Sequence, residues 1–172
     1  MSADDGAAIE ERVRARLAAL GIEYETIACD PDFADTAAFC ARYGVAPEQS
    51  ANTIVVAARK DPGVACACMV LATCRLDVNH AVCDLLGVRK ASFAAADQTR
   101  GLTGMMIGGV TPFGLPDDLP LYIDTRVMAQ DSVVIGGGGR SIKIRLAPAG
   151  LLLLPAARVI DGLAGVVEAS PA

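Results

Sequence analysis

"NTIVVAARKDPGVACACMVLAT", Asn52 to Thr73, is the stretch of sequence that decides the fold. Its first part, Asn52 to Arg59, is rich in β-branched residues and is typical of a β-strand. Asp61-Pro62-Gly63 is a turn signal, because proline and glycine favour the backbone angles of tight turns. Val64 to Thr73 is a second apolar strand, so the stretch predicts an antiparallel β-hairpin.

Helices and further strands are expected on both sides of this hairpin. Apolar spacing predicts an N-terminal helix over residues 8–20, with Gly21 directly after it. Further helices are expected over 36–43, 77–87 and 94–104, and a short one from Pro148. Further strands are expected over 22–29, 89–93, 105–107, 119–124, 132–135 and 141–146. This interleaving predicts a mixed α+β fold, and the length of 172 residues predicts a single domain over 1–172.

Composition and charge exclude several classes of protein. Hydrophobic residues make up 53% of the chain, so disorder is not expected. The net charge of −5 argues against a broad basic surface for nucleic acid, and DNA is not an expected partner. The apolar stretch over 62–73 is too short to span a membrane. The N-terminus has acidic residues where a secretory signal has bases, so a cytoplasmic protein is expected.

Cofactor, metal and nucleophile motifs are missing from the sequence. The six cysteines form no Cys-x-x-Cys pair and His80 is the only histidine, so the cysteines are expected in the core rather than around a metal. A Ser-His or Cys-His mechanism would need His80, which lies near a predicted helix start with no Gly-x-Ser-x-Gly motif. P-loop and dinucleotide-binding patterns do not fit either, so no cofactor is expected.

Two glycine-rich stretches remain, "MMIGGVTPFG" over 105–114 and "VVIGGGGRSIKIRL" over 133–146. Glycine lets main-chain N–H groups approach a ligand closely, because no Cβ stands in the way. Several such groups can hold an anion or polarise a carbonyl group. The alternative is that both stretches are glycine-containing β-turns without a ligand.

Five blocks of sequence resemble one known family in the same order. They lie over 30–31, 47–58, 75–94, 101–124 and 133–146. Together they are similar to the YbaK family, the prolyl-tRNA-synthetase-associated editing domains, over about residues 22–164. The most specific block is the Gly-x-x-x-Pro motif at Gly108 to Pro112.

The resemblance implies a barrel-like mixed β-sheet with flanking helices and a trans-acting aminoacyl-tRNA deacylase. Such proteins hydrolyse the ester of a mischarged tRNA, typically Ala or Cys on the tRNA for proline, with help from the terminal ribose hydroxyl. The expected partners are the acceptor end of an aminoacyl-tRNA and an aminoacyl-tRNA synthetase. The loop residues that the resemblance assigns to catalysis are Gly108, Gly109, Thr111 and Pro112. Those that it assigns to substrate binding are Asn52, Thr53, Gly137, Gly138 and Arg140.

One position departs from the family pattern. A lysine usually stands where this chain has Asn52, and asparagine brings no positive charge. Either another cation supplies the charge, with Arg100, Arg126 and Arg140 as candidates, or the chain binds tRNA ends or a small ligand without cleaving them. Lys143 and Arg145 share one face of the strand over 141–146, and with Arg140 they could meet tRNA phosphates or lie on a solvated face.

Overall fold

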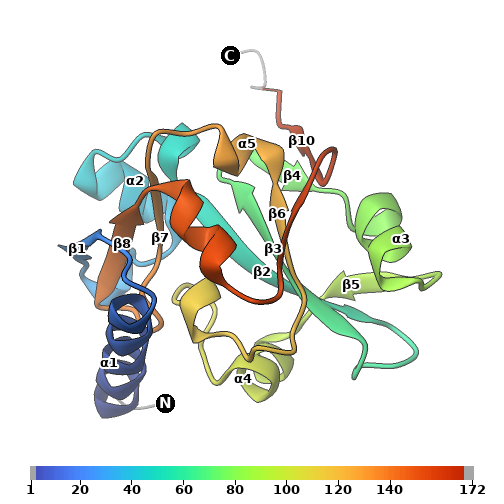
Figure 1. The fold of residues 1–172 in the computed structure, drawn as a ribbon, viewed down its shortest axis with the longest axis horizontal. Coiled ribbons are helices and arrows are strands. Elements are labelled where there is room, and N and C mark those ends of the chain that lie inside the picture. The colour runs from blue at the N-terminus through green and yellow to red at the C-terminus, as the bar shows by residue number, and fades with distance from the viewer. Residues whose placement is uncertain (1–2, 169–172) are drawn as a thin grey trace.

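The predicted hairpin lies inside a five-stranded sheet (Figure 1). A computed structural model describes residues 3–168. The strand order is β5-β2-β3-β6-β9. The strands are β2 (Ala51–Ala58), β3 (Ala65–Leu71), β5 (Ala91–Phe93), β6 (Leu121–Asp124) and β9 (Ala157–Ile160). β5, β2 and β3 pair antiparallel, whereas β6 and β9 continue the sheet in parallel with β3.

Two smaller sheets complete the β structure. The first has the order β1-β8-β7 and is antiparallel, with β1 (Tyr24–Ala28), β7 (Val133–Gly136) and β8 (Ile142–Leu146). The second pairs β4 (Cys74–Leu76) with β10 (Ala164–Val166). A single bridge between Ser50 and Val134 joins the start of β2 to β7. The mixed α+β expectation is confirmed, but the sheets of residues 3–168 stay open and do not close into a barrel.

Five helices flank the sheets in the described part of the chain. They are α1 (Ala3–Ala19), α2 (Thr36–Tyr43), α3 (Cys83–Leu86), α4 (Ala96–Thr103) and α5 (Thr125–Met128). α1 begins earlier than residue 8, because Asp4 and Asp5 in its first turn favour the positive end of the helix dipole. None of the helices in residues 3–168 is long and apolar enough to cross a membrane.

Two expected helices have a different geometry. The helix predicted over 77–87 is a π-helical turn, Val78–Val82, followed by α3. The segment that begins at Pro148 is a 3-10 helix, Pro148–Leu153. Shorter 3-10 turns lie at Pro31–Phe33, Pro47–Gln49 and Pro112–Gly114, each beginning with a proline, whose fixed φ suits a first helical position.

The strand expected over 105–107 is wrong. Gly104 ends α4 in the left-handed conformation with a φ of 72°, and the chain then turns. Met105 is fully buried, and its N–H donates to Thr103 Oγ1 at 3.0 Å. These contacts anchor the segment in the core as a loop.

The core lies on both faces of the five-stranded sheet. Alternate residues of β3 enter two different clusters, because successive side chains of a strand point to opposite faces. Met69 joins the cluster that includes α1 and β8, whereas Cys66 and Cys68 join the cluster beside α3. As expected, the cysteines are free thiols in the core: five are buried and Cys74 is half-buried. The neighbouring Cys66 thiol and burial raise the pKa of Cys68.

Candidate functional site

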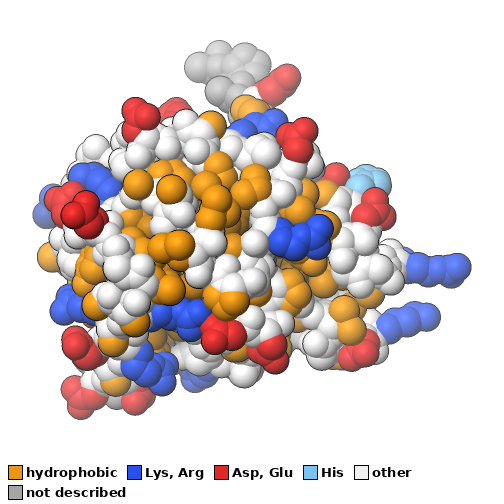
Figure 2. Space-filling model, viewed as in Figure 1, with side chains coloured by type: hydrophobic (Ala, Val, Ile, Leu, Met, Phe, Trp, Pro, Cys, Tyr) orange, Lys and Arg blue, Asp and Glu red, His pale blue; other side chains and the backbone are white. Residues whose placement is uncertain are grey.

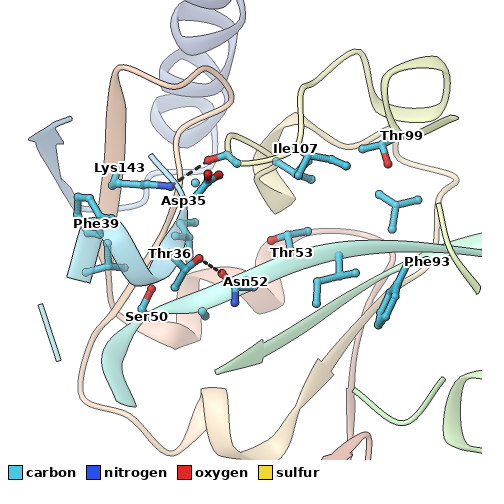
Figure 3. A pocket seen from close by; sticks show the side chains of 18 of the residues that line it. Asp35, Thr36, Phe39, Ser50, Asn52, Thr53, Phe93, Thr99, Ile107 and Lys143 are labelled. Atoms are coloured by element: carbon cyan, nitrogen blue, oxygen red, sulfur yellow. Dashed lines mark hydrogen bonds between the residues drawn. The ribbon is translucent and has the colours of Figure 1, made fainter. Parts of the chain in front are cut away.

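A pocket of about 280 Å³ lies between α2, the first half of β2, the loop after α4 and β7. Figure 3 shows β2 running along it, with Lys143 and Phe39 at one end and Thr99 and Phe93 at the other. Most of the lining is apolar, with Ile54, Ile107, Val110, Val134 and Ile135 among its members. Such a small concave space with few polar groups is the usual form of a small-molecule site.

Gly108 brings main chain to the pocket wall. Its φ of 91° lies in the region that favours glycine, and it lines the pocket together with Ile107 and Val110. A Cβ at this position would lie 2.1 Å from Arg140 Nη1. The lack of a side chain therefore lets the loop and Arg140 approach each other.

The two glycine-rich stretches pack directly against each other. The Gly138 N–H donates to the Gly109 carbonyl at 2.8 Å. A Cβ at Gly109 would lie 2.3 Å from the Gly139 carbonyl oxygen, and one at Gly136 would lie 2.4 Å from the Val110 carbonyl oxygen. Close main-chain packing thus accounts for several glycines without any ligand.

Gly137 and Gly138 lie behind the pocket wall rather than in its lining. A Cβ at Gly137 would lie 2.4 Å from Ile142 Cγ1, and one at Gly138 would lie 2.7 Å from Ile9 Cγ2 of α1. Gly136, one residue earlier, lines the pocket instead. The second stretch therefore packs against α1 and β8. The substrate-binding roles predicted for Gly137 and Gly138 stay predictions.

Asn52 and Thr53 both line the pocket. The Thr36 hydroxyl at the start of α2 donates to Asn52 Oδ1, which ties α2 to β2 (Figure 3). The Thr53 hydroxyl is buried without a hydrogen-bond partner in the described structure. A buried hydroxyl without a partner loses free energy, so it is a group that a bound ligand can satisfy.

Lys143 is the cation of the pocket, and the sequence did not single it out for this place. It is only 7% exposed, although it comes from β8, which we expected to turn this face to solvent or phosphate. Its ammonium group donates to the carbonyl of Ala34 at 2.7 Å and of Gly108 at 3.0 Å, and lies 5.5 Å from the ring centroid of Phe39. Burial lowers the pKa of Lys143 below that of an ordinary lysine.

Arg140 fastens the Gly108 loop from outside the pocket lining. Its guanidinium donates to the carbonyl of Pro31 at 2.9 Å, to that of Ile107 at 3.1 Å and to Asp35 Oδ1 at 3.3 Å. Asp35 is the acidic residue of the pocket lining, and its side chain is 71% exposed. The pocket therefore has a buried positive charge and an exposed negative charge.

The remaining loop residues are structural neighbours of the pocket. Thr111 is fully buried and its hydroxyl has no partner within residues 3–168. Pro112 is buried and begins the following 3-10 turn. Neither lines the pocket, so their predicted catalytic roles are untested.

The other basic candidates lie outside the pocket lining. Arg126 is bound to the buried carboxylate of Asp124 at 3.2 Å and to the Ala164 carbonyl at 2.9 Å. Arg100 is exposed on α4, and Arg145 pairs with Glu25 at 3.2 Å on the surface. Lys143 is thus the cation that the fold brings to Gly108 and Asn52.

His80 lies outside the pocket lining. His80 is exposed, and its ring nitrogen lies 3.1 Å from Asp77, the residue that caps the π-helical turn. Residues 3–168 contain no group of three or more His, Cys, Asp or Glu side chains that could hold a metal ion.

The chain matches the aminoacyl-tRNA editing domain family over residues 30–154. The chain therefore belongs to this family, as the ordered blocks of sequence predicted.

Solved structures have a similar fold. The chain is 27% identical to a proposed trans-editing enzyme for prolyl tRNA synthetase, with a TM-score of 0.75 over 88% of this chain and 94% of the other. It is 23% identical to the hypothetical protein APE2540, with a TM-score of 0.78 over 90% of this chain and 99% of the other. The second likeness concerns the fold alone.

Proposed function

We propose that the chain is a trans-acting deacylase that hydrolyses the ester of a mischarged tRNA of the Ala- or Cys-tRNA(Pro) type. Membership of the editing-domain family and similarity to a proposed trans-editing enzyme support this class. The observation that carries the proposal is the pocket in which the Gly108 main chain, Asn52 and the buried Lys143 ammonium meet.

The proposed hydrolysis uses the ammonium group of Lys143 and the carboxylate of Asp35. Water attacks the ester carbonyl carbon, and negative charge develops on the carbonyl oxygen before the ribose oxygen leaves with a proton. An ammonium group has three donors, of which Lys143 uses two on main-chain carbonyls, so the third can stabilise this oxygen. Asp35 supplies a carboxylate for the α-ammonium group of the amino acid.

The test is deacylation of a panel of mischarged tRNAs by the purified chain, with correctly charged Pro-tRNA as the specificity control. We expect faster release of Ala or Cys than in buffer, and loss of most of this activity in Lys143→Met. The matched control is Arg145→Met, on the same strand but in a surface ion pair. If no charged tRNA is hydrolysed faster than in buffer, the proposal fails.

Non-catalytic binding of tRNA ends or a small ligand is the second candidate, because Asn52 is neutral and tied to Thr36. The discriminating variant is Asn52→Lys. A wild-type chain that binds charged tRNA without cleaving it, and that gains activity in this variant, supports the second candidate. Robust wild-type activity that Asn52→Lys does not increase supports the deacylase.

A further inference from the structure

A second, wider hollow of about 770 Å³ lies next to the pocket. It runs between the end of β2, β4, β5 and the residues from β10 onward. Phe93 lines both the pocket and this groove, so the two spaces share one wall residue. Phe93 lies in β5, an edge strand of the sheet, and the two spaces come together at this residue.

Phe93 is 58% exposed, in contrast to the buried Phe39 and Phe113. A phenylalanine at the surface gives up part of the free energy that burial in the core would provide. Its ring is therefore available as a flat apolar surface at the boundary between the two spaces. Aromatic rings in such positions stack on nucleic-acid bases whatever their sequence.

Two arginines line the same groove. Arg59 follows β2 and Arg75 lies in β4, and both are exposed. Neither arginine forms an ion pair within residues 3–168. Asp77, an acidic residue of the groove lining, is already bound to His80. Glu168 is the other acid in the lining.

Further cations stand beside the groove. The Arg59 N–H donates to the Lys90 carbonyl at 3.0 Å, which brings the end of β2 next to the start of β5. Lys60, Arg89 and Lys90 are exposed there. Figure 2 shows Lys and Arg side chains projecting at the edge where Figure 1 has β5 and the β2–β3 turn. Five basic side chains thus gather at this end of an acidic protein, beside the acids Asp61, Asp77 and Glu168.

A competing exit from the pocket lacks these features. Another hollow shares Thr36 and Asn52 with the pocket, and its remaining lining is Ala37, Cys40, Ala41, Val45, Pro47 and Ala72. None of these described residues carries a charge, so phosphates would find no cation there. The groove beyond Phe93 is the exit whose chemistry suits a polyanion.

We propose that this groove binds the single-stranded 3′ end of tRNA, with Phe93 stacking on the terminal base and Arg59 and Arg75 contacting phosphates. The inference rests on the proposed function, because the ester in the pocket is attached to the terminal ribose. The chain of nucleotides must leave the pocket from that ribose.

The test compares two substrates: an aminoacyl-tRNA and the same amino acid esterified to adenosine, which has no phosphates. The double variant Arg59→Ala/Arg75→Ala should raise KM about tenfold for the tRNA and leave the adenosine ester unaffected. The salt slope of log kcat/KM should fall by about 1.4, at about 0.7 per phosphate contact. Phe93→Leu should raise KM at least about fivefold for both substrates, because the terminal base is common to them.

The control is Arg12→Ala, an exposed arginine of α1 outside the groove, which should change neither substrate. Unchanged tRNA kinetics in the double variant, or equal losses on both substrates, would overturn the inference. Loss of self-association in sedimentation by the double variant, with unchanged tRNA kinetics, would also overturn the inference. The groove would then be a contact between two copies of the chain.

An RNA-binding measurement tests the groove independently of the proposed deacylase activity. A fluorescent RNA hairpin ending in unpaired CCA is titrated with wild type and the double variant. Weaker binding by the double variant supports the groove even if the wild type hydrolyses no ester. Equal binding, or no binding by the wild type, overturns the groove even if the wild type is an active deacylase.

Discussion

Lys143 shows how a single side chain acquires a chemical role from its surroundings. An exposed lysine carries a hydrated charge that contributes little to binding. Here two main-chain carbonyls and the ring of Phe39 hold the ammonium in a mostly apolar pocket. Electrostatic interactions are stronger in such a site, which suits this one charge to the role proposed for it above.

Replacing Lys143 should separate charge from packing. We expect Lys143→Met to lower kcat about a hundredfold, since loss of one preorganised donor to an oxyanion typically has that effect. Circular dichroism melting should show a folded protein, because methionine has a similar volume and removes a buried charge. Near-wild-type kcat in a folded Lys143→Met variant would exclude a role for the ammonium in the reaction.

The pH dependence gives an independent measurement. Burial lowers the pKa of Lys143, so the charged form is lost at a lower pH than in an ordinary lysine. The rate above spontaneous ester hydrolysis should fall as the pH rises through this lowered pKa, because the charged form is lost there. In Lys143→Arg the fall should disappear, because guanidinium stays charged over the whole range. A fall that persists in a folded, active Lys143→Arg variant would belong to another group.

Three of the residues singled out from the sequence line the pocket. These are Asn52, Thr53 and Gly108, which the resemblance to the editing domains had pointed out. Lys143 was assigned only to a strand face. Nothing in its neighbours along the chain shows that Phe39 of α2 covers that face, since this contact joins residues far apart in sequence.

At the scale of elements, the two glycine-rich loops act as one wall. Their contacts are made by main-chain atoms of Gly109, Val110, Gly136 and Gly138. Arg140 adds side-chain hydrogen bonds to the Ile107 carbonyl and to Pro31. The wall therefore depends on the absence of Cβ atoms at the contact.

A pair of glycine variants tests this contact. Gly109→Ala would place a Cβ 2.3 Å from a main-chain oxygen, and should reduce the free energy of unfolding by about 1–3 kcal/mol. Gly101→Ala in α4 has no heavy atom within 4 Å of the new Cβ, and should raise it by about 0.5–1 kcal/mol. Urea unfolding measures the free energy of unfolding of both variants. Equal changes in this free energy would mean that the loop contact is not close in solution.

Elements with a strong local pattern were predictable. The hairpin of β2 and β3, the range of α2 and the alternating β8 all follow from the sequence near them. The short strands β4, β9 and β10 were missed. The side chains of β9 are exposed or half-buried, so its apolar pattern is weak, and its pairing with β6 is visible only in the folded chain.

For the whole molecule, the five-stranded sheet separates two clusters of the core. β3 is buried along its entire length and pairs with β2 on one side and β6 on the other. β5 and β9 are the edges of this sheet, and each is short. The pocket and the groove both lie along the half of the sheet that contains β2 and β5.

Amide hydrogen exchange should reflect this layout. We expect the slowest exchange in β3, because its amides open only with the whole core, and faster exchange in β5 and β9. Exchange followed by NMR or mass spectrometry gives the order. Faster exchange in β3 than in β9 would contradict a stable centre at the hairpin.

The main-chain junction of the two loops has a consequence for how selectivity can change. Glycine backbones make the contact between the two loops, whereas Val110 and Val134 of the wall also pack in the core. Ile107 lines the pocket and is 53% exposed, so it can be exchanged for a larger or smaller residue while the wall keeps its position. A change at this one position would alter the shape of the pocket without disturbing the main-chain contact that builds it.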